Sequence, residues 1–245
     1  MKKSIHGMYS AKYLLSIEEC DEALLRRAFS RVDETRRKKA ERMRNVKSRA
    51  ACLGAGLLLQ LAVGEALCGT GGGQSGLLNR AKGSMPNGMR CYSMCELLDV
   101  LAEAPCMPIK YRYNKNGKPY FSEFPFYFNL SHSGKYVLCG LSEEEIGADI
   151  QQHCACDRRR LADRFFSEGE KAALAACGED ENLFFRLWAR KEAYGKLTGE
   201  GIAHVLDLNL MTEKQMVLNG RRVEFEEIGD IAGYSIAFCR YSEID

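Results

Sequence analysis

Apolar and polar residues follow several rhythms along the chain, and each rhythm predicts a kind of element. Residues 48–67 carry apolar side chains at helical spacing, for example Leu53, Leu57 and Leu61, which predicts a buried helix. Residues 18–30 and 33–46 predict two helices before it, of which the second is strongly basic. Residues 5–15 predict a short strand at the start.

The middle of the chain favours strands and turns. Extended runs are expected at 109–113, at 126–130 and 136–141 on either side of a turn at 131–134, and at 146–151, with a helix at 92–103. Residues 114–119 have turn chemistry. The glycine-rich run at 69–76 lacks the GK[ST] ending of a phosphate-binding loop, so we expect a flexible connection reaching to about residue 90.

Helices return after residue 165. Ser167 and Glu170 form a capping-box pattern that predicts a helix from there to about Ala176, with a stop at Gly178. A second helix is expected at 181–197, ended by Gly199, and short strands at 205–210, 215–218, 222–228 and 234–240. Helices mixed with antiparallel strands predict an α+β fold.

Composition indicates an ordinary globular chain, with 46% apolar and 28% charged residues among 245. No uninterrupted apolar run reaches about 18 residues, and the N-terminus lacks the apolar core of a signal peptide, so we expect a cytoplasmic protein. The eleven cysteines are scattered. The clusters at 153–156 (HCAC) and at Cys91 and Cys95 lack the partners of a four-ligand zinc site, so reduced thiols are expected.

Positive charge is concentrated in one segment. Residues 26–49 contain eleven Lys or Arg against three Asp or Glu, a local charge near +8, although the whole chain carries only +2. Such a block attracts polyanions, which could be a phosphate-rich cofactor, an acidic protein or nucleic acid. A solvated helix face is the alternative.

Two carboxylates stand on elements that could face each other. Residues two apart share one face of a strand, so Asp149 and Gln151 point together, opposite an apolar core face. Residues four apart share one face of a helix, which lines up Trp188, Glu192 and Lys196. Hard oxygen ligands of this kind suit Mg²⁺ with phosphate oxygens. A surface ion pair between Glu192 and Lys196 is the alternative.

Several short motifs, in order, resemble the 4′-phosphopantetheinyl transferase superfamily, in its longer, surfactin-synthetase-activating single-chain type. They lie at residues 117–119 (GKP), 129–134 (NLSHSG), 147–151 (GADIQ), 165–167 (FFS) and 188–193 (WARKEA), followed by Lys196. The resemblance implies a pseudo-twofold pair of similar α+β halves, here 1–145 and 146–245, with the site between them. The glycine-rich stretch near 69–90 then reads as an insertion in the first half.

The resemblance also implies roles for individual residues. Asp149, Gln151 and Glu192 would bind Mg²⁺, with Gln151 standing where the family commonly has Glu. Glu192 and Lys196 would be catalytic. Coenzyme A would be held by a set of basic and polar side chains: Arg49, Lys118, Ser131, His132, Lys191 and Lys196, and less surely Arg36 and Lys39.

The implied activity is that of a holo-[acyl-carrier-protein] synthase. It would move phosphopantetheine from coenzyme A to a serine of an apo carrier protein and release adenosine 3′,5′-bisphosphate. Its partner would be an acyl carrier protein or a carrier domain of fatty-acid, polyketide or nonribosomal peptide synthesis. We expect a monomer that binds neither membrane nor nucleic acid. Two alternatives stay open: a degenerate coenzyme A-binding protein and a protein that binds nucleic acid or another polyanion.

Overall fold

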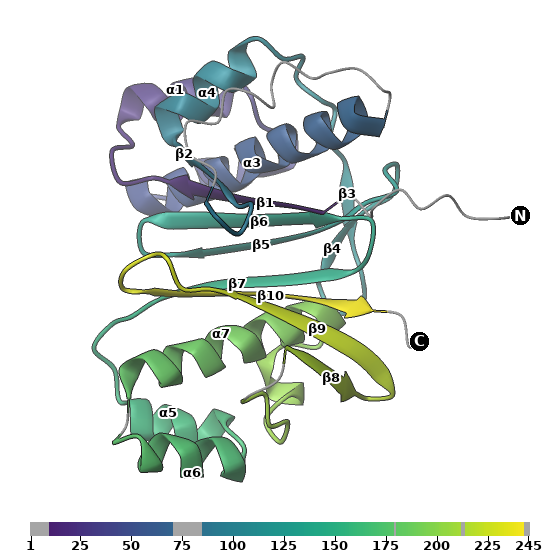
Figure 1. Cartoon of the computed structure of the whole chain (residues 1–245). Helices are drawn as coiled ribbons and strands as arrows, with labels where there is room; N and C mark the ends of the chain where they lie inside the picture. The colour runs from purple at the N-terminus through teal and green to yellow at the C-terminus, as the bar shows by residue number, and fades with distance from the viewer. Residues whose placement is uncertain (1–9, 71–84, 179, 212–213, 243–245) are drawn as a thin grey trace, which may run out of the picture.

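Two stacked sheets form the centre of the molecule, with helices on both outer faces (Figure 1). This computed structural model describes residues 10–70, 85–178, 180–211 and 214–242. In spatial order the first sheet contains β2 (Arg90–Ser93), β1 (Ser10–Ser16), β6 (Tyr136–Ser142) and β5 (Tyr127–Ser133). The second contains β7 (Ile146–Gln152), β10 (Tyr234–Ser242), β9 (Arg221–Ile228) and β8 (Gln215–Leu218). The predicted α+β class is confirmed.

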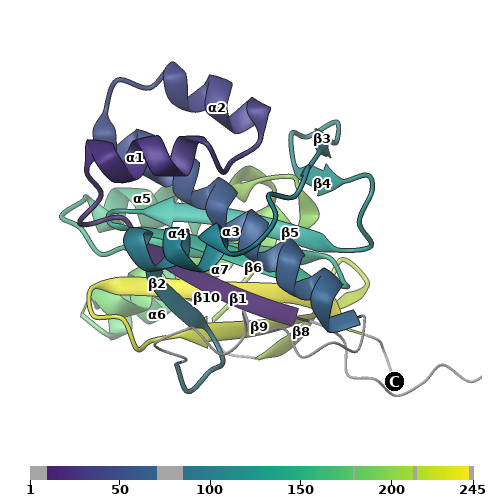
Figure 2. The same cartoon turned by 90° about the horizontal axis from the view of Figure 1, so that it is seen from above.

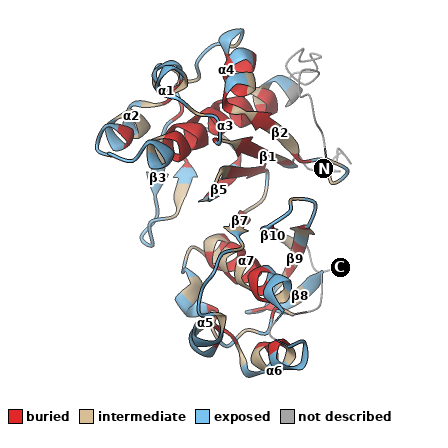
Figure 3. Cartoon of the chain, turned by 90° about the vertical axis from the view of Figure 1, so that its left-hand side faces the viewer, coloured by how far each residue is buried: buried red, intermediate tan, exposed pale blue. Residues whose placement is uncertain are grey.

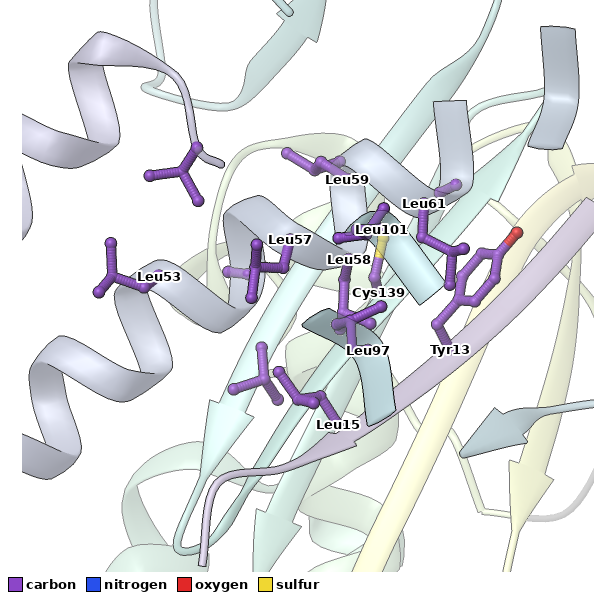
Figure 4. Close-up of a cluster of buried hydrophobic side chains, with 14 of the residues drawn as sticks. Tyr13, Leu15, Leu53, Leu57, Leu58, Leu59, Leu61, Leu97, Leu101 and Cys139 are labelled. Carbon is purple, nitrogen blue, oxygen red and sulfur yellow. The ribbon is translucent and has the colours of Figure 1, made fainter. Parts of the chain in front are cut away.

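The first sheet is covered by α3 (Val46–Thr70), the buried helix that apolar spacing predicts. Its leucines pack with α4 (Met94–Ala102), with Tyr13 and Leu15 of β1 and with Cys139 of β6 (Figure 4). Residues 46–68 of α3 are long and apolar enough to cross a membrane, which the search for uninterrupted apolar runs missed. However, 83% of that window is buried inside the protein, as expected of a core helix, since a helix that is apolar all round must be covered.

The other elements of the first half lie around α3. The helices α1 (Glu22–Phe29) and α2 (Glu34–Glu41) pack against it (Figure 2). Each of the two helices is capped by an aspartate side chain. The hairpin of β3 (Tyr111–Tyr113) and β4 (Pro119–Phe121) stands beside the first sheet. Residues 10–15 of the predicted strand at 5–15 belong to β1, and residues 5–9 lie outside the described residues.

The second sheet is covered by α7 (Glu181–Thr198). Before it come α5 (Arg158–Phe165) and α6 (Glu168–Ala176), and the predicted capping box of α6 is present. Gly199 ends α7 with φ of +76°, a conformation that glycine adopts without strain. Figure 3 shows buried residues concentrated where α3 and α7 meet their sheets.

Two local predictions were wrong, one helix was missed, and one prediction is only partly tested. Residues 131–133 belong to β5 rather than to a turn, because Ser131 and His132 continue the ladder opposite Leu138 and Val137. Residues 205–210 form no strand; they follow the 3-10 helix η2 (Ile202–His204). The pattern missed α5 altogether. The predicted loop at 69–90 lies partly outside the described residues, at 71–84, and its end is ordered around Met89, which is 0% exposed.

The two halves share an order of elements. Each begins with a strand (β1 or β7), continues through two short helices into a long helix, and ends with a strand (β6 or β10) that pairs antiparallel with the first. Between the sheets lies a common apolar layer that includes Ile146, Ala148 and Ile150. The pseudo-twofold relation and the division at residue 145 stay predictions.

Candidate functional site

The predicted site residues of β7 and α7 meet at one end of the contact between the two sheets. β5 and β7 run side by side there, joined through side chains: Asn129 Oδ1 accepts from the Ala148 amide at 3.2 Å. The helix α7 lies close against β7 because residue 147 is glycine; a Cβ there would stand 2.0 Å from the Ala193 carbonyl oxygen. This close approach places Lys196 of α7 within hydrogen-bond distance of Asp149 of β7.

Asp149 is the centre of the site. Its Oδ1 accepts hydrogen bonds from Ser131 Oγ at 2.7 Å and from Lys196 Nζ at 2.6 Å, while Lys196 also donates to Ser131 Oγ at 2.9 Å. The residue is only 4% exposed, and its second oxygen, Oδ2, is buried without a hydrogen-bond partner. A buried carboxylate oxygen without a donor is unfavourable, so this atom fits a cation.

Glu192 supplies the second carboxylate. It is half-buried on α7, and burial, together with the negative charge of Asp149, raises its pKa, while Lys196 opposes the shift. Two carboxylates that repel each other in a partly dry place also fit a divalent cation. The cluster holds only these two acidic groups, and the described residues contain no group of three or more His, Cys, Asp or Glu placed to hold a metal.

A cavity of about 390 Å³ opens at these residues. Trp188, Glu192 and Lys196 of α7 line it, together with Asp149 and Gln151 of β7. Trp188 also packs against Phe165, Phe166 and Phe184, so its ring belongs to the core as well as to the cavity wall. Gln151 donates its amide Nε2 to the Gln152 carbonyl oxygen at 3.1 Å.

His132 lies at the same cavity and is affected by the charge of Lys39. His132 lines it, and loss of surrounding water lowers the pKa of its ring, with Lys196 and Lys39 lowering it further and Asp149 opposing them. An electrostatic effect of Lys39 on His132 means that the basic helix α2 reaches this side of the molecule. The sequence did not reveal that approach, because α2 and β5 lie about ninety residues apart.

Lys118 lies at a neighbouring cavity of about 660 Å³, whose wall also includes Leu130 and Lys196 of the first. Lys118 Nζ donates to the Leu197 carbonyl oxygen at 2.6 Å, near the C-terminal end of α7. Burial lowers its pKa, and Glu145 opposes that shift. Glu200 and His204 line this cavity too, and no sequence motif singled them out.

Lys191 is turned away from both cavities. Its ammonium is 0% exposed and donates to the carbonyl oxygens of Val205, Leu206 and Leu208 at 2.8, 3.1 and 2.7 Å. It also pairs with the buried Glu170 at 3.0 Å. All its donors are therefore used inside the protein, and the prediction that Lys191 holds a phosphate does not agree with this geometry.

Arg49 and Arg36 serve contacts within the first half. Arg49 forms an ion pair with Glu22, which joins the start of α3 to the start of α1. Arg36 donates to the Cys52 carbonyl oxygen at 3.3 Å and lies over the Tyr111 ring. Contact of either arginine with coenzyme A stays a prediction.

A separate cavity of about 690 Å³, lined by Lys12, Glu226 and other residues, contains none of the predicted site residues.

Comparison with known proteins agrees with the motifs. Residues 145–239 match the family described as the 4′-phosphopantetheinyl transferase superfamily. The chain is 40% identical over 105 residues to 4′-phosphopantetheinyl transferase psf-1 of Bacillus pumilus, covering 42% of this chain and 45% of that protein. It is 36% identical over 102 residues to Sfp of Bacillus subtilis, covering 40% and 45%, and 45% identical over 92 residues to AcpT of Escherichia coli, covering 36% and 47%.

The resemblance drawn from the motifs is thus confirmed for residues 145–239, which carry a 4′-phosphopantetheinyl transferase superfamily region. The chain spans about half the length of the curated relatives it matches. The matched region contains Asp149, Gln151, Glu192 and Lys196, whereas Lys39, Lys118 and His132 lie before it.

Proposed function

We propose that the protein transfers the 4′-phosphopantetheine group of coenzyme A to a serine of an apo carrier protein, in a Mg²⁺-dependent reaction that releases adenosine 3′,5′-bisphosphate. The observation that carries the proposal is the pair of carboxylates, Asp149 and Glu192, beside Lys196 at a cavity within the superfamily region. A nucleic-acid or polyanion binder would leave this pair without a role, whereas a degenerate coenzyme A-binding protein could keep the pair and lack transfer activity.

Mg²⁺ would be held by Asp149, through the unpartnered Oδ2, and by Glu192. When bound, the metal would neutralise the charge that grows on the pyrophosphate oxygens during transfer. Gln151 would add a neutral amide oxygen where the family commonly supplies a third carboxylate. We therefore expect Gln151→Glu to lower the Mg²⁺ concentration needed for half-maximal activity, and an unchanged Mg²⁺ dependence would argue against a ligand role.

The cationic side chains would hold the anionic ends of coenzyme A. Lys196 lines the cavity from α7, and burial lowers the pKa of His132, with the positive charges of Lys196 and Lys39 lowering it further. A bound phosphate would relieve that repulsion and favour the protonated ring. Lys118, in the neighbouring cavity, is our candidate for the nucleotide end, and Ser131 offers a hydroxyl beside Lys196.

Glu192 is our candidate for the group that accepts the proton of the attacking serine. A serine hydroxyl is a poor nucleophile while it keeps its proton, and a base works best when its pKa lies near the working pH. The raised pKa of Glu192 moves its carboxylate in that direction. Lys196 would then stabilise the charge on the leaving bisphosphate.

The partner and setting follow from the same proposal. Carrier proteins are acidic beside their modified serine, so the basic segment at 26–49 offers a complementary charge. We infer a cytoplasmic monomer built as a pseudo-twofold pair of halves.

The test is intact-protein mass spectrometry of apo carrier proteins incubated with this protein, coenzyme A and Mg²⁺. We expect a mass gain of one phosphopantetheine, abolished by a chelator and by Glu192→Gln but not by Glu168→Gln, a matched change at a surface carboxylate on α6. Coenzyme A binding without any gain on fatty-acid or peptidyl carriers would favour a degenerate member. RNA binding without coenzyme A binding would favour a polyanion binder.

A further inference from the structure

The seam between β5 and β7 connects the two sheets beside the proposed metal site (Figure 1). Both strands are edge strands, β5 of the first sheet and β7 of the second. Side chains of β5 make the connection. Three of them reach β7, and they are spaced two residues apart, so they lie on one face of β5: Asn129, Ser131 and Ser133.

The three side chains of this row do not all do the same thing. Asn129 Oδ1 accepts from the backbone amide just before Asp149 at 3.2 Å, and Ser133 Oγ accepts from the Gln152 amide at 2.9 Å. These two bonds hold the backbone of β7. Ser131, between them, donates its hydroxyl to Asp149 Oδ1 at 2.7 Å. Ser131 is therefore the member of the row that touches the carboxylate itself.

The Ser131 hydroxyl acts as donor and acceptor at once. It donates to Asp149 Oδ1 and accepts from Lys196 Nζ at 2.9 Å, while Lys196 also donates to Asp149 Oδ1 at 2.6 Å. Ser131 is 8% exposed and Asp149 is 4% exposed, so these bonds are largely shielded from water. Two donors thus hold one carboxylate oxygen, and the other, Oδ2, is left buried without a hydrogen-bond partner.

We propose that Ser131 is a positioning residue for metal binding, which fixes the orientation of the Asp149 carboxylate so that Oδ2 is kept for the cation. This role rests on the proposed function, whose metal site it completes from the first sheet. The torsion that turns an aspartate carboxylate has broad preferences, so hydrogen bonds decide its orientation. Without the Ser131 hydroxyl, Lys196 would be the remaining donor to Oδ1 among the described residues, and the carboxylate could turn both oxygens toward its ammonium.

The expected consequence is a specific loss of metal affinity. When both oxygens of Asp149 face Lys196, the ammonium and a metal ion compete for the same atoms, although the charge of the site is unchanged. Groups that orient metal ligands typically contribute about 10–100-fold to metal affinity. The hydroxyl of Ser131 should therefore matter more for metal binding than its single hydrogen bond matters for folding.

The test is Mn²⁺ binding to the full-length protein, followed by the electron paramagnetic resonance signal of the free ion, because Mn²⁺ and Mg²⁺ prefer the same oxygen ligands. Ser131→Ala should raise the Kd for Mn²⁺ about tenfold or more. Ser133→Ala, a matched loss of a hydroxyl from the same row, should leave the Kd nearly unchanged.

Two conservative variants separate the hydrogen bond from the volume of the side chain. Ser131→Thr keeps the hydroxyl and should restore Mn²⁺ binding close to that of the wild type. Ser131→Cys keeps nearly the same volume, but a thiol is a weak donor, so its affinity should fall like that of Ser131→Ala. Full affinity in Ser131→Cys would mean that the hydroxyl does not orient Asp149, and would overturn the proposal.

Thermal unfolding of the same preparations separates positioning from a general structural role. Ser131→Ala and Ser133→Ala each remove one hydrogen bond across the seam, so we expect similar losses of Tm and a loss of metal affinity only in the first. Equal Kd values for Ser131→Ala and the wild type, or the same rise in Ser133→Ala, would overturn the positioning role and leave the transferase proposal standing. Absence of Mn²⁺ binding by the wild type would overturn the metal site and the positioning role together.

Discussion

Glu65 in the first half and Asp149 in the second half are both buried carboxylates, but they have different neighbours. In the first half, Glu65 of α3 is 1% exposed, and its Oε2 accepts from Tyr13 Oη at 2.5 Å and from Arg90 Nη1 at 2.6 Å. In the second half, Asp149 of β7 meets Ser131 and Lys196 at similar distances.

The difference lies in what else is close. Arg90 lies over the Tyr13 ring, so the network around Glu65 is packed between β1, β2 and α3. Asp149 lines a cavity and feels a second carboxylate, Glu192, whose pKa it helps to raise. Glu65 has Arg90 as its own cationic partner, although burial raises its pKa and leaves its Oε1 without a hydrogen-bond partner, whereas Asp149 and Glu192 share one lysine and are short of positive charge. The second arrangement is suited to binding.

The largest expected effect is a difference in thermal stability between substitutions of two lysines of α7, Lys191 and Lys196. Lys191→Met leaves Glu170 charged and buried without its ion-pair partner, which should cost about 3 kcal/mol or more of unfolding free energy and lower Tm by on the order of 10 °C. Lys196→Met should lower Tm by less, because the Lys196 side chain is 29% exposed and its partner Asp149 lines a cavity, and it should reduce transfer roughly 10²-fold. Thermal unfolding and carrier-protein modification check both changes, and equal Tm losses would erase the distinction.

A smaller effect compares one glycine from each half. A Cβ on Gly147 would meet the Ala193 carbonyl oxygen at 2.0 Å, and that backbone cannot move aside without shifting α7. A Cβ on Gly54 would meet the Leu15 side chain at 2.6 Å, which can rotate. Gly147→Ala should therefore cost about 3 kcal/mol and Gly54→Ala about 1 kcal/mol in denaturant unfolding. The reverse order would show that α3, not α7, is the more tightly placed helix.

The smallest expected effect is the pH dependence of the Tm change caused by Glu192→Gln. Because its pKa is raised in the folded protein, the ionised carboxylate opposes folding above the ordinary pKa of 4.5, and this penalty disappears as the pH falls below that value. Glu192→Gln should therefore increase Tm at pH 7, on the order of 1–3 °C, with the gain shrinking toward pH 4. A Tm difference that stayed constant between pH 4 and 7 would mean that ionisation of Glu192 is not its cause.

Much of the site could be predicted from the sequence because it depends on local periodicity. The two-residue period of β7 and the four-residue spacing on α7 are properties of single elements, so the shared faces of Asp149 with Gln151 and of Glu192 with Lys196 followed directly. Lys191 was misjudged because its partners, Glu170 and the carbonyl oxygens of 205–208, belong to other segments.

The same limit applies to the fold. The capping box of α6 and the glycine that ends α7 are local signals, and both elements were predicted well. The extent of β5 depends on pairing with β6, so Ser131 and His132 read as a turn from the sequence alone. The approach of Lys39 to His132 results from helix packing over the first sheet, which no local pattern encodes.

The most direct test of the contrast between the two halves is a paired measurement on Asp149→Asn and Glu65→Gln. Each substitution replaces one carboxylate oxygen by an amide nitrogen and removes the negative charge. Tm and the rate of carrier-protein modification would be measured on the same preparations. The account predicts that Asp149→Asn keeps its Tm within a few degrees and loses transfer roughly 10²-fold or more, while Glu65→Gln loses several degrees of Tm and retains transfer below its own Tm. Transfer by Asp149→Asn at the wild-type rate would contradict the account.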